Sequence, residues 1–295
     1  MTHSPIIIIG MHRSGTSLIS ELLEDLGLFI GQHKDRNHEA MFFRRTNQWL
    51  LEVCGGQWYN PEPFDQLLEH PSARPLTADF LRFLLKTPRA ANYLGWGNYL
   101  RLRDVGRMNA PWGWKDPRNT YTLPLWMDLF PQAKVVHIYR NGVDAANSLY
   151  TRSAQRNLRG LSRWQRLDRR IGYALLSIYP NIRVNDFSLE ACFALWERYT
   201  TKADAQIASL PPERTFVLRY EDFLQSPQPF LRELCDFTGV AANAAQIERA
   251  SSKVKPERGS AYERDETLRT FYESVKDTPQ MARYGYGTAI KASSI

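Results

Sequence analysis

The sequence predicts an α/β protein: a single domain over residues 1–295, with a central parallel sheet flanked by helices. The first observation is an unbroken apolar run, Ile6–Ile9, which is typical of a strand buried on both faces. The second is the glycine-bounded turn and helical pattern that follow it. The third is the alternation of further strand and helix patterns, which requires right-handed crossovers and therefore parallel strands.

The composition is that of a globular protein, with 43% hydrophobic and 23% charged residues. The three cysteines are widely spaced and form no metal or redox pattern, which favours a reducing compartment. The sequence has no signal-like N-terminal segment and no run of about 18 apolar residues, so we expect a cytoplasmic protein without a transmembrane segment. The net charge of +7 favours an anionic ligand or partner.

The turn after the first strand has the mechanics of a phosphate-binding loop. Gly10, Gly15 and Ser17 match the spacing of a Walker A loop, and a helical apolar pattern follows them. Strand, turn and helix in this order direct backbone N–H groups at an anion. However, Thr16 stands where the Walker A loop has its lysine, and a cation, Arg13, lies inside the loop instead. The loop therefore predicts a P-loop-like nucleotide-binding core, and it suits a 5′-phosphate that is not followed by a phosphate chain.

A polar segment, Phe29–Glu39, follows the first helix and can reach the same edge of the sheet. Three of its residues could take a proton: His33, His38 and Glu39. The next part of the chain, about residues 40–110, is expected to form a helical insertion beside the sheet.

Trp112–Lys115 is predicted to be a short strand that ends in a charged corner. Lys115, Asp116 and Arg118 would then lie at a strand end, where α/β proteins hold their ligands. A helix is predicted over Leu123–Phe130.

A second strand-to-helix unit starts with the predicted strand Val135–Tyr139. Asn141 is placed to cap the following helix. Arg140 at the strand exit and Ser148 on that helix could converge on one phosphate. His137, inside the strand, is interpreted as a core residue. Further along, the patterns predict a helix over Ala191–Ile207, a strand and turn over Thr215–Phe223, a helix from Pro227 and a polar helix over Tyr262–Val275.

Seven arginines lie between residues 152 and 170, six of them spaced by three or four residues, which places those six on one helical face. They are Arg152, Arg156, Arg159, Arg163, Arg166, Arg169 and Arg170. Two interpretations stay open: an ordinary solvated face, or a platform for a polyanion such as an acidic polysaccharide or for a membrane surface. Sequence-specific nucleic acid is less favoured, because no recognised motif accompanies the arginines. A second helical insertion is expected at about residues 152–210.

Three separated motifs, taken together, resemble those of sulfotransferases that use 3′-phosphoadenosine 5′-phosphosulfate (PAPS). Met11–Ser17 looks like their 5′-phosphosulfate loop, and Tyr139–Ser148 looks like their 3′-phosphate motif. Arg219–Phe223, with the helix that ends before Gly239, looks like their later strand and helix. Lys115–Arg118 is similar to a segment between the two phosphate motifs. The resemblance covers roughly residues 5–260 and implies the PAPS-dependent sulfotransferase fold.

The resemblance also implies a role for each matching residue. The 5′-phosphosulfate would be held by Arg13, by the backbone N–H groups of Ser14, Gly15, Thr16 and Ser17, and by the hydroxyls of Thr16 and Ser17. The 3′-phosphate would be held by Arg140 and Ser148, with Arg258 and Gly259 as a further basic element, and Tyr220 would lie near the adenine. In related enzymes a Glu soon after the first helix is often the general base, which here is Glu39. Other branches use a His in the segment that begins at Lys115, where this chain has none before Phe130.

The expected reaction is transfer of a sulfuryl group from PAPS to an acceptor hydroxyl or amine. Glu39 would act as base, Arg13 and Lys115 would stabilise the leaving phosphate, and no metal is expected. If Glu39 is not the base, His33, His38 or Asp116 would take its place. The alternatives are a P-loop kinase-like phosphotransferase and a non-catalytic nucleotide- or polyanion-binding protein. A small-molecule or glycan acceptor is expected, with a tilt toward carbohydrate because several aromatic faces could stack on sugars: Trp58, Tyr59, Trp96, Trp112 and Trp114.

Overall fold

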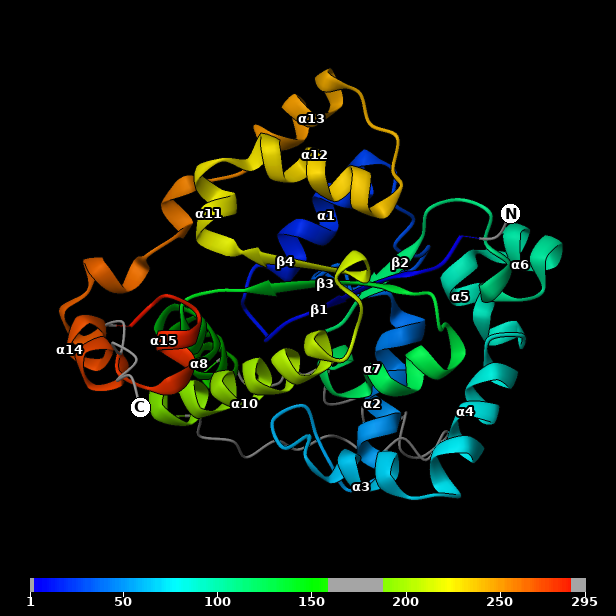
Figure 1. Ribbon diagram of the computed structural model, residues 1–295, viewed down its shortest axis with the longest axis horizontal. Helices are drawn as coiled ribbons and strands as arrows, with labels where there is room; N and C mark the ends of the chain where they lie inside the picture. The colour runs from blue at the N-terminus through cyan, green and yellow to red at the C-terminus, as the bar shows by residue number, and fades with distance from the viewer. Residues whose placement is uncertain (1–2, 159–187, 288–295) are drawn as a thin grey trace.

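A four-stranded parallel sheet forms the centre of the computed structural model, which describes residues 3–158 and 188–287 (Figure 1). The strands are β1 (Ile6–Ile9), β2 (Gly113–Lys115), β3 (Lys134–Tyr139) and β4 (Thr215–Arg219). Their order is β2-β1-β3-β4, and each neighbouring pair is parallel. The predicted α/β class with a central parallel sheet is therefore confirmed.

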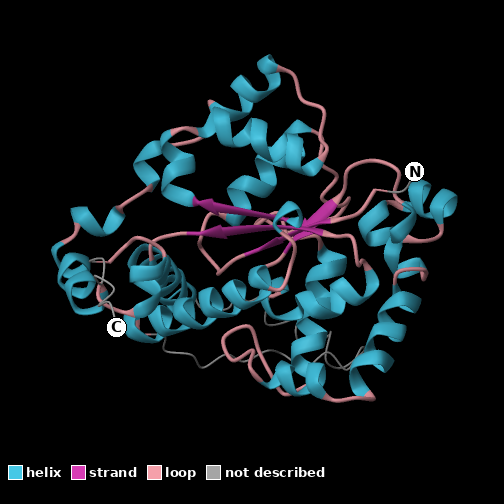
Figure 2. Ribbon diagram, in the orientation of Figure 1, coloured by secondary structure: helices cyan, strands magenta, loops and turns pink. Residues whose placement is uncertain are grey.

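Helices cover both faces of this sheet (Figure 2). The described α-helices are α1 (Thr16–Leu26), α2 (Met41–Val53), α3 (Pro63–Glu69), α4 (Ala73–Leu84), α5 (Ala91–Leu94), α6 (Trp96–Leu102), α7 (Asn119–Leu129), α8 (Gly142–Leu158), α10 (Leu189–Ala208), α11 (Tyr220–Gln225), α12 (Pro227–Thr238), α13 (Ala244–Ser251), α14 (Glu266–Val275) and α15 (Pro279–Arg283). Short 3₁₀ turns are η1 (Pro88–Ala90), η2 (Val105–Arg107), η3 (Pro212–Arg214), η4 (Pro256–Arg258) and η5 (Ala261–Arg264). None of these described helices is long and apolar enough to cross a membrane.

β1 is buried on both sides because its side chains alternate between two cores. Ile6 and Ile8 pack with apolar residues of α1, α12 and α13, which lie above the sheet in Figure 1. Ile7 and Ile9 pack on the opposite face, where α2, α7, α8 and α10 lie. The run of four isoleucines thus reflects a strand with no solvent-facing side.

The segment from α2 to η2 consists of α-helices and short 3₁₀ turns, and its interpretation as an insertion beside the sheet stays a prediction. The helix after β2 differs from the prediction, because α7 begins at Asn119 rather than at Leu123. Of the arginines between residues 152 and 170, Arg152 lies on α8, whereas residues 159–187, with five of those arginines, are outside the described residues. The proposed polyanion platform therefore stays a prediction.

His137 is a core residue, as predicted from its place inside a strand. Its side chain is buried in β3 between Tyr139 and Tyr284, with ring-centroid distances of 6.0 Å and 6.2 Å. Burial lowers the pKa of His137 to about 4, because the interior disfavours the charged imidazolium. The imidazole is therefore neutral in the folded protein at neutral pH.

We expect His137 to make the protein less stable in mild acid. In the unfolded chain its pKa is about 6.5, so as the pH falls from 6.5 toward 4 only the unfolded state takes up the proton. This single group should lower the free energy of unfolding by about 3 kcal/mol across that window and contribute nothing more below it. Urea unfolding of the wild type and of His137→Leu at several pH values measures the difference in slope. Parallel pH dependences in the two proteins would contradict the prediction.

Candidate active site

The loop between β1 and α1 presents open backbone N–H groups. Gly15 is the N-terminal flanking residue of α1, and no side chain caps that helix end. Within residues 3–158 and 188–287, the N–H groups of Gly15, Thr16 and Ser17 donate to no acceptor. The N–H of Ser14 differs, because it donates to the carbonyl of Met11 at 3.2 Å. Three adjacent N–H groups at a helix N-terminus form a site for an anion.

Two glycines allow this loop to lie close to the neighbouring strands. Gly10 has φ 138°, and a Cβ there would lie 2.3 Å from the carbonyl oxygen of Ile138 in β3. Gly15 has φ 91°, and a Cβ there would lie 2.2 Å from the ring of Tyr220, the first residue of α11 directly after β4. Arg13 also has a positive φ, 74°, which is rare for a residue with a side chain. The loop conformation therefore depends on glycine at both positions.

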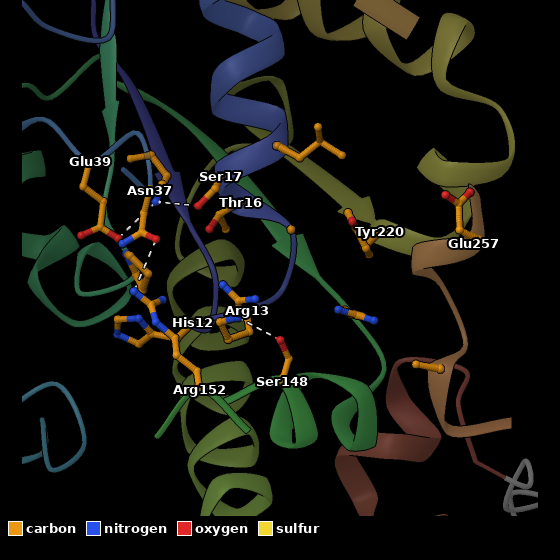
Figure 3. A pocket seen from close by; sticks show the side chains of 16 residues that line it. His12, Arg13, Thr16, Ser17, Asn37, Glu39, Ser148, Arg152, Tyr220 and Glu257 are labelled. Atoms are coloured by element: carbon orange, nitrogen blue, oxygen red, sulfur yellow. Dashed lines mark hydrogen bonds and ion pairs between the residues drawn. The ribbon is translucent and has the colours of Figure 1, made fainter. Parts of the chain in front are cut away.

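The side chain of Arg13 points along the loop toward α8. Its Nε donates to the hydroxyl oxygen of Ser148 at 2.9 Å (Figure 3). The cation expected at the 5′ end of the nucleotide is thus in contact with a residue expected at the 3′-phosphate.

Arg140 lies beyond the end of β3 and is held in place from two sides. Its Nη2 donates to Asp144 Oδ2 at 3.0 Å, and its guanidinium carbon lies 5.3 Å from the centroid of the Tyr220 ring. Asp144 also accepts from the backbone N–H groups of Ala261 and Tyr262, at 3.0 Å and 2.8 Å. This carboxylate therefore ties the C-terminal segment to the arginine beside the cavity.

Lys115 and Glu39 form a buried ion pair below the phosphate loop. Lys115 Nζ lies 3.1 Å from Glu39 Oε1 and also donates to the Ser17 hydroxyl oxygen at 3.2 Å. The second carboxylate oxygen of Glu39 lies 3.4 Å from Arg44 Nε and 4.0 Å from Arg118 Nη1. Burial raises the pKa of Glu39, while Lys115 opposes that rise. A carboxylate in this setting can accept a proton more readily than an exposed one.

These groups line one cavity of about 410 Å³ at the carboxyl edge of the sheet. Figure 3 shows Glu39, Asn37 and Arg152 on one side of it and Tyr220 and Glu257 on the other, with Thr16 and Ser17 between them. We call it the donor cavity, after the role that the sequence analysis leads us to expect of it. The predicted site residues that line it are Arg13, Gly15, Thr16, Ser17, Glu39, Lys115, Arg140, Ser148 and Tyr220.

The other predicted residues lie elsewhere. Ser14 is fully buried in the loop and does not line the cavity. Gly259 is also outside the lining, although Glu257 and Ala261 of the same segment belong to it. The backbone of Arg258 lies in η4, and its side chain is outside the described part of the structure.

A second cavity of about 480 Å³ adjoins the donor cavity, and we call it the acceptor cavity after the role expected of it if the first cavity holds the donor. The two share four lining residues: His12, Asn37, Glu39 and Arg152. Glu39 therefore borders the donor cavity, next to the phosphate loop, and also the acceptor cavity.

The substitutes considered for Glu39 as base are poorly placed. Asp116 is fully buried, where it accepts from Arg118 at 3.0 Å and from Asn47 at 3.0 Å. His38 faces away toward α1, 3.4 Å from Glu24 and 3.7 Å from Glu21. Neither these residues nor His33 line the two cavities.

His12 is a site residue that the sequence reasoning missed. It lies in the phosphate loop and lines both cavities, and its ring contacts Trp58 edge-on at 4.8 Å. Burial and the nearby cations Arg118 and Lys115 lower its pKa well below the ordinary value, so the ring is neutral. The only available signal was its position inside the loop motif.

The aromatic residues that could stack on a sugar lie in different environments. Trp112 and Trp114 are fully buried in the core around β2, where Trp114 stands 3.9 Å from the stacked ring of Phe43 centre to centre. Trp96 is 64% exposed and lines neither cavity. Trp58 alone among the five aromatic residues lines the acceptor cavity.

Among solved structures, the chain is similar to the sulfotransferase domain from the curacin biosynthetic pathway, with 17% identity over 97% of this chain and 98% of that chain and a TM-score of 0.49. It is also similar to the sulfotransferase domain from the Synechococcus PCC 7002 olefin synthase (19% identity, 97% and 96% covered, TM-score 0.47). A third similar structure is a sulfotransferase from Alicyclobacillus acidocaldarius (18% identity, 98% and 98% covered, TM-score 0.48). Likenesses this distant do not bear on the reaction.

No curated protein matches the chain. The model of the sulfotransferase family, by contrast, matches residues 5–244. That span contains the phosphate loop, all four strands and both members of the buried Lys115–Glu39 pair. The chain therefore belongs to the sulfotransferase family.

Proposed function

We propose that this protein transfers a sulfuryl group from PAPS to a hydroxyl or amine of a small-molecule or glycan acceptor. The observation that supports it most is the convergence of three cations, Arg13, Lys115 and Arg140, on one cavity beside the open N-terminus of α1. A nucleotide with anionic groups at both ends needs cations at separate points, and these three come from different strand ends. Thr16, in place of a lysine, fits a donor without a phosphate chain.

In the proposed complex, the N–H groups of Gly15, Thr16 and Ser17 bind the 5′-phosphosulfate together with Arg13. Arg140 and Ser148 bind the 3′-phosphate, and Tyr220 flanks the adenine. Asp144 acts on this end of the site indirectly, because it holds Arg140 in place. The residues present therefore fit the donor at both of its anionic ends.

In the proposed reaction, the acceptor oxygen attacks the sulfur while the bond from sulfur to the bridging phosphate oxygen breaks. The acceptor proton passes to Glu39, which borders both cavities. The electron pair of the broken bond stays on the 5′-phosphate of the leaving nucleotide. Lys115 and Arg13 stabilise that added charge as preorganised cations.

Removing the cation of Arg140 should weaken nucleotide binding. Arg140→Ala should cost about 1.5–3 kcal/mol of binding free energy for adenosine 3′,5′-bisphosphate, because a charge-assisted contact is lost. Isothermal titration calorimetry measures this directly. Arg45→Ala is the matched control, because Arg45 is exposed on α2 and lines neither cavity. Equal affinities of the Arg140 variant and the wild type would contradict the assignment.

The same calorimetry separates the donor classes. Binding of adenosine 3′,5′-bisphosphate without binding of ATP–Mg²⁺ supports a PAPS donor, and the reverse would favour a kinase-like phosphotransferase. Turnover of radiolabelled PAPS with a panel of acceptors separates an enzyme from a non-catalytic binder, since a binder gives none.

Glu39→Gln tests the base. The amide cannot take the acceptor proton, so turnover should fall by about 10²–10⁴-fold while nucleotide affinity is retained. Steady-state kinetics and calorimetry measure the two quantities, and Glu52→Gln, an exposed change on α2, is the control. A near-normal rate would move the base to His12, which also borders both cavities.

The pH dependence tests the Lys115–Glu39 pair. Glu39 must be deprotonated to act, so its raised pKa puts the acid limb of kcat/KM above the ordinary range of a glutamate. Lys115→Met removes the cation that opposes this rise, so the acid limb should move to still higher pH. The control is Lys34→Met, whose ion pair with Glu24 lies outside both cavities. If the acid limb lies at the same pH in the wild type and in Lys115→Met, then Lys115 does not set the pKa that limits kcat/KM.

A further inference from the structure

A third cavity, of about 450 Å³, lies on a different side of α2 from the acceptor cavity. Met41 and Arg44 line the acceptor cavity, whereas Phe42, Arg45 and Trp49, at helical spacing, line the third one. We call it the aromatic cavity. Its walls come from α2, α4, η1 and α5, and its lining residues are Phe42, Arg45, Thr46, Trp49, Phe80, Leu84, Arg89 and Asn92. It shares none of them with the donor or the acceptor cavity.

Two aromatic side chains from different helices form one wall of the aromatic cavity. The rings of Trp49 on α2 and Phe80 on α4 lie 5.0 Å apart, centroid to centroid. They are 39% and 40% exposed, whereas Phe42 and Leu84, which complete the apolar lining, are buried. Large aromatic faces that stay accessible side by side in a concave site favour an aromatic ligand.

Two cations, Arg45 and Arg89, line the same cavity, and none of its lining residues is acidic. Both arginines are exposed, one on α2 and the other in η1. Within residues 3–158 and 188–287, neither guanidinium group has an ion pair or a hydrogen bond. A guanidinium group recognises a carboxylate through paired N–H groups, so the polar part of the cavity favours a carboxylate.

Asn92 on α5 adds a polar group that the described part of the protein leaves unsatisfied. Its side-chain oxygen is buried and has no hydrogen-bond partner there. Its backbone carbonyl, by contrast, accepts from the N–H of His33 at 3.3 Å, so the main chain is held while the side-chain amide is not. Buried amides usually find a partner. An amide with no bond to hold it can turn and pair with a polar group of a ligand.

We propose that the aromatic cavity is a second ligand site, which binds an aromatic carboxylate. The ring of the ligand packs on Trp49 and Phe80, its carboxylate is bound by Arg45 and Arg89, and the amide of Asn92 supplies a further polar contact. The inference does not rest on the proposed function, because the three cavities differ in the residues that carry each argument. Absence of sulfuryl transfer from PAPS would leave it standing.

A matched pair of compounds tests this site. 3-Phenylpropionate and 3-phenylpropionamide have the same ring and chain and differ in charge. Each is titrated into the ¹⁵N-labelled protein while the indole N–H signals of the tryptophans are followed by NMR. The signal of Trp49, identified as the one missing from Trp49→Phe, should shift. The carboxylate should bind about three- to tenfold more tightly than the amide at low salt, and added salt should reduce this preference because both arginines are exposed.

Arg45→Gln and Arg89→Gln should each reduce the preference for the carboxylate, and the double variant should abolish it. Arg101→Gln should leave it intact, because Arg101 is an exposed arginine on α6 that lines none of the three cavities. Equal binding of the two compounds, a preference that survives in the double variant, or no shift of the Trp49 signal at millimolar concentrations would each overturn the inference. A shift of the Trp58 signal in place of that of Trp49 would also overturn it, since the compound would then occupy the acceptor cavity.

Discussion

The close approach of the phosphate loop to its two neighbouring strand ends is the constraint on which the site depends. Gly10 leaves no room for a side chain against the carbonyl of Ile138, and Gly15 leaves none against the ring of Tyr220. Both residues also have positive φ, which glycine adopts without strain. Because β1 pairs with β3, and β3 with β4, these contacts bring the exits of three strands to one point. Arg140 and Tyr220 reach the cavity for that reason.

The electrostatics of Glu39, the proposed base, follow from where β2 lies. β2 pairs with β1 in register, with Ile8 opposite Lys115, so the lysine emerges beside the phosphate loop. It is almost fully buried there and meets the equally buried Glu39. A buried carboxylate without a partner would be strongly disfavoured in its charged form, and a cation alone would be as well. The pair keeps both charges in place, while burial still raises the pKa of Glu39.

The sequence could predict the elements whose signal is local. Ile6–Ile9, the glycine spacing and Arg140 at a strand exit depend on short patterns, and the parallel-sheet rule then places the strand ends together. Other features depend on tertiary packing between distant segments. Arg13 contacts Ser148, Glu39 borders two cavities, and His38 points toward α1. The sequence includes Trp112 and Trp114 among the aromatic residues that could stack on a sugar, because it does not show which side chains are exposed. Burial of β2 on both faces instead puts them in the core.

The phosphate loop has Thr16 where a Walker A loop has its lysine, and a lysine from another part of the fold supplies the cation. A Walker A lysine extends from the start of the helix toward its phosphates. Here the first turn of α1 carries Thr16 and Ser17, and the ammonium group beside Ser17 belongs to Lys115, 3.2 Å away on the adjacent strand. The positive charge is therefore present at the helix N-terminus, but it is anchored to β2 and shared with Glu39. A cation held in this way is coupled to the protonation of Glu39, because a proton gained by this carboxylate leaves the charge of Lys115 unbalanced. In the proposed reaction that imbalance would lie on the side of the cavity where the leaving phosphate stands.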